Sequence, residues 1–86
     1  RHPGLRILLI APPPVQELGP LNGEFIGAAA KGQALAPLLQ SYADTRGLGF
    51  LDAGRVLQTS PIDGIHYEPQ GHEALAIAAA KALRAL

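Results

Sequence analysis

The sequence predicts an α/β fold with a parallel sheet, to which this chain contributes about two strands and two helices. Two short apolar segments, residues 6–11 and 49–53, have the composition of buried strands. Between them the spacing of apolar residues becomes helical from about residue 24 to residue 46, which provides the crossover that two parallel strands require. A second helical segment begins near Pro69 and runs to the C-terminus.

The first strand is a continuous apolar run that reads Arg-Ile-Leu-Leu-Ile-Ala. Because apolar and polar side chains do not alternate in it, we expect this strand to be buried on both faces, as strands of parallel sheets are. Three prolines, Pro12 to Pro14, end the strand, since proline cannot donate to a strand ladder. Residues 15–23 contain two glycines, a proline and an asparagine, and are expected to form a loop.

The first helix has one apolar stripe and one interruption. Pro37 lies inside it and removes the backbone hydrogen bond to the Gln33 carbonyl, so we expect a kink or a restart there. Gly47 directly follows Arg46 and is the expected C-cap. The stripe has the spacing of one helix face and consists of Ala28, Leu35, Leu38, Leu39 and Tyr42.

Residues 54–69 are expected to be mostly loop, with a short turn around residues 55–58. The C-terminal helix that follows has a polar face of Glu73, Lys81 and Arg84, and Ile77 on that side is expected to be exposed. The apolar face of this helix consists of Leu75, Ala79, Ala82, Leu83 and Leu86.

Two strands are too few for the fold that they predict. Sheets usually have about four to six strands, and an apolar strand such as residues 7–10 needs neighbours on both edges and helices on both faces. The 86 residues also contain no Met, so Arg1 is not expected to be a natural translation start. We therefore expect the chain to be part of one α/β domain, whose missing strands come from another chain or from an unobserved stretch.

The composition excludes several classes of function. Apolar residues make up 48% and charged residues 16% of the chain, which is typical of a folded core. Seven basic residues balance seven acidic ones, so the charges indicate neither nucleic-acid nor membrane-surface binding. The absence of Cys excludes disulfides, thiol catalysis and Cys-ligated metals. No signal peptide is visible and the natural N-terminus is expected to be missing, so the compartment stays open, with a slight preference for the cytoplasm.

The loop before the C-terminal helix holds a candidate catalytic pair. Sites in open α/β sheets form beyond the carboxyl ends of the strands, and residues 58–72 follow the second strand there. Asp63 and His66 lie three residues apart around Gly64, so the Asp63 carboxylate can accept the Nδ1 proton of His66. This contact leaves Nε2 of His66 available to accept a proton, which is the arrangement of the base and its orienting acid in a nucleophilic triad.

Other interpretations of this loop stay open. Asp-Gly is common in turns, so the Asp63–His66 contact could be a local hydrogen bond in a non-catalytic α/β binding or interaction module. A metal site could use Asp63, His66, Glu68 and His72, although their spacing fits no compact zinc pattern and His72 is expected to point elsewhere. Ser60 is interpreted as a hydroxyl that caps the loop rather than as a nucleophile.

The whole segment resembles the last block of the SGNH (GDSL-type) hydrolases. The motif Asp-Gly-Ile-His at residues 63–66, followed by Gly-His at 71–72 and an Ala- and Leu-rich helix, carries the resemblance. Residues 8–14, 25–31 and 50–54 are similar in order and spacing to arylesterase-like members, so the resemblance spans nearly the entire chain. It implies a three-layer α/β/α sandwich with a parallel, flavodoxin-like sheet, of which residues 1–86 are the C-terminal portion of a single domain.

The resemblance also implies an activity and roles for particular residues. Asp63 would be the acid and His66 the general base of a Ser-His-Asp triad that hydrolyses small carboxylic esters, with acyl transfer to alcohols where water is poorly admitted. Ile65, Phe25 and Val15 would line the apolar wall of an acyl or alcohol pocket. No metal and no organic cofactor is implied.

Some of the catalytic groups that the resemblance implies are not present in this sequence. The nucleophilic Ser of the Gly-Asp-Ser-Leu block and the Gly and Asn of the oxyanion hole have no counterparts here. We expect a complementary N-terminal segment or chain to supply them, and we expect the chain alone to be inactive. The assembled enzyme could form a homo-oligomer, and neither nucleic acid nor a membrane is expected as a partner.

Overall fold

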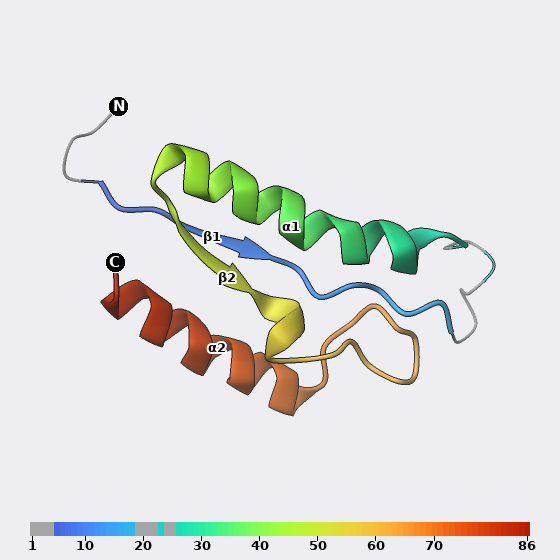
Figure 1. The fold of residues 1–86 in the computed structure, drawn as a ribbon. Helices are drawn as coiled ribbons and strands as arrows, with labels where there is room; N and C mark the ends of the chain where they lie inside the picture. The colour runs from blue at the N-terminus through green and yellow to red at the C-terminus, as the bar shows by residue number, and fades with distance from the viewer. Residues whose placement is uncertain (1–4, 19–22, 24–25) are drawn as a thin grey trace.

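The computed structural model of the protein describes residues 5–18, 23 and 26–86 and has an α/β fold (Figure 1). Its elements follow in the order β1 (Leu8–Ala11), α1 (Ala28–Arg46), β2 (Gly49–Asp52), the 3-10 turn η2 (Ala53–Arg55) and α2 (Pro69–Arg84). The predicted strands and helices are thereby confirmed in type and in order.

β1 and β2 pair in parallel, with a register that runs from Leu8 opposite Gly49 to Ala11 opposite Asp52. The helix α1 connects them, so the predicted β-α-β crossover is present. Parallel pairing also brings the carboxyl ends of both strands to one edge of the sheet. The segments that leave the two strands therefore run toward the same end of the molecule (Figure 1).

The sheet lies between the two helices, which gives the chain three layers (Figure 1). The helix α1 packs against both strands, whereas α2 packs mainly against β2. The buried apolar side chains in the part of the chain described are small, apart from Leu57, and they are Ala11, Ala43, Ala53 and Leu57. Small side chains let the helices approach the sheet closely, because protein interiors pack without large voids.

β1 is less buried than its composition predicted. Ile10 in the strand is 39% exposed, and Ile7 just before it is 46% exposed. Within the described residues β1 pairs with β2 alone, and α2 packs mainly on β2, so one face and one edge of β1 have little cover. The elements described here therefore do not supply burial on both faces, and full burial of β1 within a larger sheet stays a prediction.

The helix α1 presents a different face to the sheet from the one predicted. Leu35, Leu38 and Tyr42 of the predicted stripe are exposed, and Leu38 is 68% exposed. The least exposed positions at helical spacing are Ala29, Gly32, Ala36, Leu39 and Ala43. A Cβ atom at Gly32 would lie 3.1 Å from the Cα of Pro14, so the segment after β1 runs too close for a large side chain at this position. The predicted stripe is therefore wrong for Leu35, Leu38 and Tyr42, whereas Leu39 lies on the less exposed face.

The ends of α1 are held by specific backbone contacts. Gly27 at its N-terminus has a φ of 88° and offers no side-chain cap. The carboxylate of Glu17 accepts hydrogen bonds from the backbone N–H groups of Gly27 and Ala29, at 3.0 and 3.1 Å, and so performs the capping. Gly47 caps the C-terminus as predicted, with a φ of 69°. The helix runs through Pro37 without the predicted restart, because both Pro37 and Gln33 face solvent, where water can bond the free carbonyl.

The helix α2 begins at Pro69, as predicted, and its polar residues Glu73, Lys81 and Arg84 are exposed together with Ile77. Leu83, expected on the apolar face, is 55% exposed. The short turn before the loop lies at η2 rather than at residues 55–58, because the Asp52 side chain accepts a hydrogen bond from the Gly54 N–H and caps it there.

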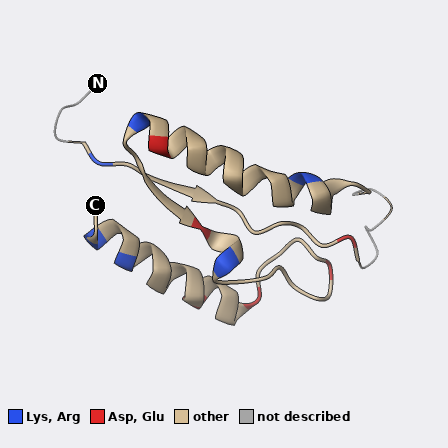
Figure 2. Ribbon diagram, in the orientation of Figure 1, with Lys and Arg blue, Asp and Glu red and all other residues tan. Residues whose placement is uncertain are grey.

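Charged residues of both signs are spread along the described part of the ribbon (Figure 2). Basic residues occupy the last turns of both helices, with Arg46 in α1 and Lys81 and Arg84 in α2, where they complement the negative end of the helix dipole. None of the described helices combines the length and the apolar character that crossing a bilayer requires.

Candidate active site

The candidate site lies where the segments that follow the two strands run side by side. Residues 12–18 leave β1, and residues 56–68 lead from η2 to α2. A backbone hydrogen bond joins the segments directly, because the N–H of Gln16 donates to the carbonyl oxygen of Gly64 at 2.8 Å. This is the edge of a parallel sheet at which α/β proteins form their sites.

Asp63 and His66 make the contact that their spacing predicted. Nδ1 of His66 donates to Oδ2 of Asp63 at 2.5 Å. The other carboxylate oxygen, Oδ1, accepts from the backbone N–H groups of Ile65 and His66, at 2.8 and 3.0 Å. Both oxygens of Asp63 are therefore engaged, and the bond to Nδ1 fixes the tautomer of His66 in which Nε2 carries a lone pair.

The same contacts set the acidity of Asp63. The hydrogen bond from the His66 ring, followed by those from the backbone N–H groups of Ile65 and His66, lowers the pKa of Asp63 from 3.8 to about 2. Asp63 is therefore ionised at neutral pH, as the orienting acid of a triad must be.

Ser60 organises the loop from its interior. Its side chain donates to Oε1 of Glu68 at 2.6 Å and accepts from the N–H of Ile62 at 3.1 Å. Its backbone N–H donates to the carbonyl oxygen of His66 at 2.6 Å, and its carbonyl oxygen accepts from the N–H of Gly64 at 2.7 Å. Ser60 is 5% exposed. These contacts match the loop-capping hydroxyl that the sequence predicted, and they engage the hydroxyl of Ser60 both as a donor and as an acceptor.

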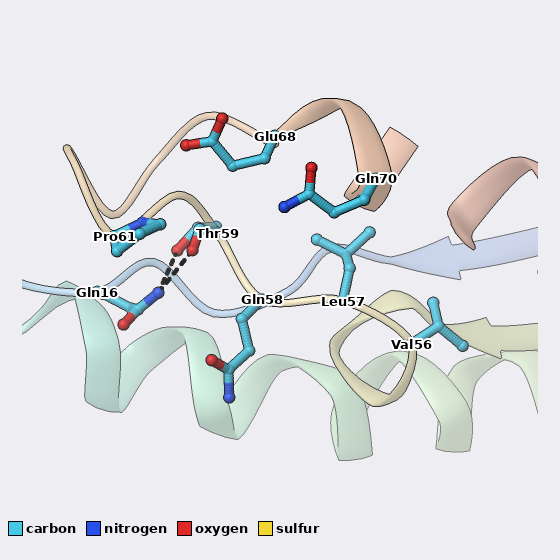
Figure 3. Close-up of a pocket in the computed structure, with 9 residues that line it drawn as sticks. Gln16, Val56, Leu57, Gln58, Thr59, Pro61, Glu68 and Gln70 are labelled. Atoms are coloured by element: carbon cyan, nitrogen blue, oxygen red, sulfur yellow. Dashed lines mark hydrogen bonds between the residues drawn. The ribbon is translucent and has the colours of Figure 1, made fainter. Parts of the chain in front are cut away.

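The side chain of Gln16 was missed by the sequence analysis. Its Nε2 donates to both the carbonyl oxygen and the Oγ1 of Thr59, at 2.8 and 3.0 Å (Figure 3). Thr59 is 3% exposed. A cavity of about 290 Å³ adjoins this contact, between the loop and the start of α2, and Glu68 and Gln70 also line it (Figure 3). No local sequence pattern could reveal a contact between residues 43 positions apart.

Two of the predicted substrate-binding residues line hollows near the loop. Ile65 lines a hollow of about 350 Å³ with His66, Tyr67 and His72. Val15 lines a cavity of about 420 Å³, beside Ala29 of α1. The backbone bond between Gln16 and Gly64 joins their two segments, and a common apolar wall of Ile65 and Val15 stays a prediction. Phe25 lies outside the described residues.

The residues considered for a metal site are engaged in other contacts. Glu68 accepts the hydrogen bond from Ser60. The ring of His72 lies against Tyr67, with 5.2 Å between the ring centroids. Across residues 5–18, 23 and 26–86, no three His, Asp or Glu side chains come close enough together to hold a metal ion.

Solved structures with the same fold identify the relatives of this chain. The aryl esterase of M. smegmatis is 30% identical to it, with a TM-score of 0.85 over 99% of this chain and 40% of that one. A carbohydrate acetylesterase from Sinorhizobium meliloti is 32% identical, with a TM-score of 0.86 over 98% of this chain and 40% of that one. The chain matches part of an SGNH (GDSL-type) hydrolase. The resemblance predicted from the sequence is thereby confirmed.

A more distant structure has the same fold. A GDSL-like lipase from Bacteroides thetaiotaomicron matches 95% of this chain and 44% of its own length, with a TM-score of 0.72 and 20% identity. This chain spans less than half of the length of each of the three proteins that it matches. Comparisons with models of protein families and with curated proteins gave no match.

The low pKa of Asp63 predicts that the stability of the loop depends on pH. Because the folded carboxyl has a lower pKa than its ordinary value, its contribution to stability is present above 3.8 and is lost as the pH falls through about 2. Carbon-13 NMR of the Asp63 carboxyl is expected to give a titration midpoint near 2, and His66→Ala is expected to move it toward 3.8. His72→Ala, which leaves the bond intact, is the control. An unchanged midpoint in His66→Ala would show that the hydrogen bond from His66 is not the main reason for the low pKa of Asp63.

Two glycines with similar backbone conformations test the close approach of Gln16 to the loop. Gly64 has a φ of 73° and Gly47 a φ of 69°, but a Cβ at Gly64 would lie 2.0 Å from the carbonyl oxygen of Gln16, whereas a Cβ at Gly47 would meet no atom within 4 Å. Gly47→Ala carries only the backbone strain, so we expect it to lower the free energy of unfolding by about 1 kcal/mol.

Gly64→Ala adds the steric clash to the same strain and is expected to cost about 3 kcal/mol or more. Urea unfolding of the two variants measures the difference. Equal losses in both variants would show that the loop can move away from Gln16 at no cost.

Proposed function

We propose that this chain supplies the acid and the general base of a Ser-His-Asp triad in an enzyme that hydrolyses small carboxylic esters. The observation that carries the proposal is the 2.5 Å contact between Nδ1 of His66 and Oδ2 of Asp63, in a loop beyond the carboxyl end of β2. The likeness to an aryl esterase and a carbohydrate acetylesterase supports ester hydrolysis as the reaction.

In the proposed reaction, Nε2 of His66 takes the proton from a serine hydroxyl as the serine oxygen attacks the ester carbonyl carbon. Hydrogen-bond donors around the carbonyl oxygen stabilise the oxyanion that forms. His66 then returns the proton to the leaving alcohol as the carbon–oxygen bond breaks, which leaves an acyl-serine. A water molecule repeats the sequence and releases the acid; an alcohol in its place would receive the acyl group instead.

Asp63 supports the charged state of His66 in these steps. Its pKa of about 2 keeps the carboxylate ionised, and the negative charge of Asp63 beside the Nδ1–H group stabilises the imidazolium that each proton transfer produces. The hydrogen bonds from the N–H groups of Ile65 and His66 hold the carboxylate in place during the reaction.

The nucleophile in this proposal comes from outside the chain. The hydroxyl of Ser60 is engaged by Glu68 and by the N–H of Ile62, and Ser41 lies within α1 rather than on a turn that follows a strand. The serine and the oxyanion-hole groups are assigned to a complementary N-terminal portion or chain, which is consistent with the 40% of the related esterases that this chain spans.

One observation also fits a non-catalytic module. The three contacts of Asp63 all reach residues within three positions, and a loop can use such contacts simply to close a turn. In that case His66, whose side chain is 80% exposed in this chain, would accept no proton from a serine and would have no catalytic role.

Activity measurements on the complete enzyme, this chain together with the portion that carries the serine, separate the two functions. Removing the base by His66→Ala is expected to lower kcat for ester hydrolysis by about 10⁴-fold or more. Asp63→Asn is expected to lower kcat by a similar order, since an amide would favour the wrong tautomer of His66.

His2→Ala is the matched control, because the sequence places this histidine in a polar N-terminal tetrapeptide away from the motif, and its turnover is expected to equal that of the unaltered enzyme. Near-normal turnover in His66→Ala would exclude the triad and favour the non-catalytic module.

A further inference from the structure

We propose that Gln16 is a positioning residue, which holds both arms of the Asp63–His66 loop so that His66 meets the serine in the reactive geometry. This inference rests on the proposed function. It concerns a residue whose hydrogen bonds reach Thr59 and Gly64 rather than Asp63 or His66 themselves.

The first arm of the loop is held by the Gln16 side chain. Its Nε2 donates to the carbonyl oxygen of Thr59 at 2.8 Å and to Oγ1 of Thr59 at 3.0 Å (Figure 3). Thr59 is 3% exposed, so water has little access to replace these bonds. Thr59 precedes Ser60, whose N–H donates to the carbonyl oxygen of His66 at 2.6 Å. A shift of Thr59 would therefore carry His66 with it.

The second arm is held by the Gln16 backbone. The N–H of Gln16 donates to the carbonyl oxygen of Gly64 at 2.8 Å, and Gly64 lies directly after Asp63. The absence of a side chain at Gly64 permits this approach, since a Cβ there would meet the carbonyl oxygen of Gln16 at 2.0 Å. Gln16 thus fixes the chain on both sides of the catalytic pair.

No other described residue outside the loop and α2 hydrogen-bonds to residues 59–66. The remaining hydrogen bonds of the loop are internal, such as that of Ser60 with Glu68, or lead from Glu68 into the first turn of α2. Among the described residues, Gln16 is therefore the one that ties residues 59–66 by hydrogen bonds to the segment that follows β1.

The segment that carries Gln16 is itself rigid. Pro12, Pro13 and Pro14 link it to β1, and the proline ring fixes φ at each of these positions. Pro13 is buried, and Pro14 lies so close to Gly32 of α1 and Gly54 of η2 that a Cβ on either glycine would come within 3.1 Å of it. The backbone at Gln16 therefore has little freedom to move, so its hydrogen bonds can hold the loop in one position.

The test uses the complete enzyme and a graded set of variants. Gln16→Met keeps the length of the side chain but removes its donors, and it is expected to lower kcat by about 100-fold with KM nearly unchanged, because a small misplacement of a catalytic group has that cost. Thr59→Val removes only the hydroxyl contact and is expected to fall between Gln16→Met and the unaltered enzyme. Thr59→Ser keeps the hydroxyl and is expected to restore nearly full turnover. Gln40→Met, at an exposed position of α1, is the control.

A double-variant cycle shows whether Gln16 acts through His66. If it does, adding Gln16→Met to His66→Ala is expected to cause no further loss, since the group that it positions is already absent. An equal loss of activity in both backgrounds would overturn the inference, as would a kcat for Gln16→Met within threefold of the unaltered enzyme. Should Gln16→Met fail to fold, Thr59→Val in the same cycle decides by the same criteria. High activity of His66→Ala alone would instead overturn the proposed function, and with it this inference.

Discussion

The parallel pairing of β1 with β2 brings the proline segment after β1 and the loop after η2 to the same edge of the sheet. Gln16 then joins the two segments through its backbone bond to Gly64 and its side-chain bonds to Thr59. The placement of the loop relative to the sheet follows from this arrangement, because without these bonds the loop that bears the catalytic pair would have no hydrogen bond to the segment after β1.

Within the loop, contacts between near neighbours orient Asp63, and contacts over a longer span close the loop. The bonds from His66 and from two backbone N–H groups orient and ionise Asp63, and they span three residues or fewer. The contacts of Ser60 with His66, Gly64 and Glu68 close the loop into a compact unit. The bond between the pair can therefore form within the chain, whereas the proposed reaction also needs a serine placed against the exposed face of His66, which the remainder of an SGNH-type domain would supply.

The features that could be predicted from the sequence are those that depend on neighbouring residues. The two strands, the start of α2 at Pro69, the cap at Gly47 and the Asp63–His66 bond all follow from short patterns. Leu35, Leu38 and Tyr42 of α1 were predicted wrongly because apolar spacing records hydrophobicity and not the room available. On the face that packs, Pro14 leaves no room for a large side chain at Gly32. The bond between Gln16 and Thr59 depends on how distant segments meet, which no local pattern encodes.

The central claim is that His66 is the base for a serine that this chain does not contain. The most direct measurement is an experimental structure of the complete enzyme, this chain together with the portion that carries the serine. The account predicts that Nε2 of His66 lies about 2.6–3.2 Å from the hydroxyl oxygen of that serine, with the Asp63 bond retained. A structure in which no serine hydroxyl approaches Nε2, or in which Asp63 turns away from His66, would contradict it.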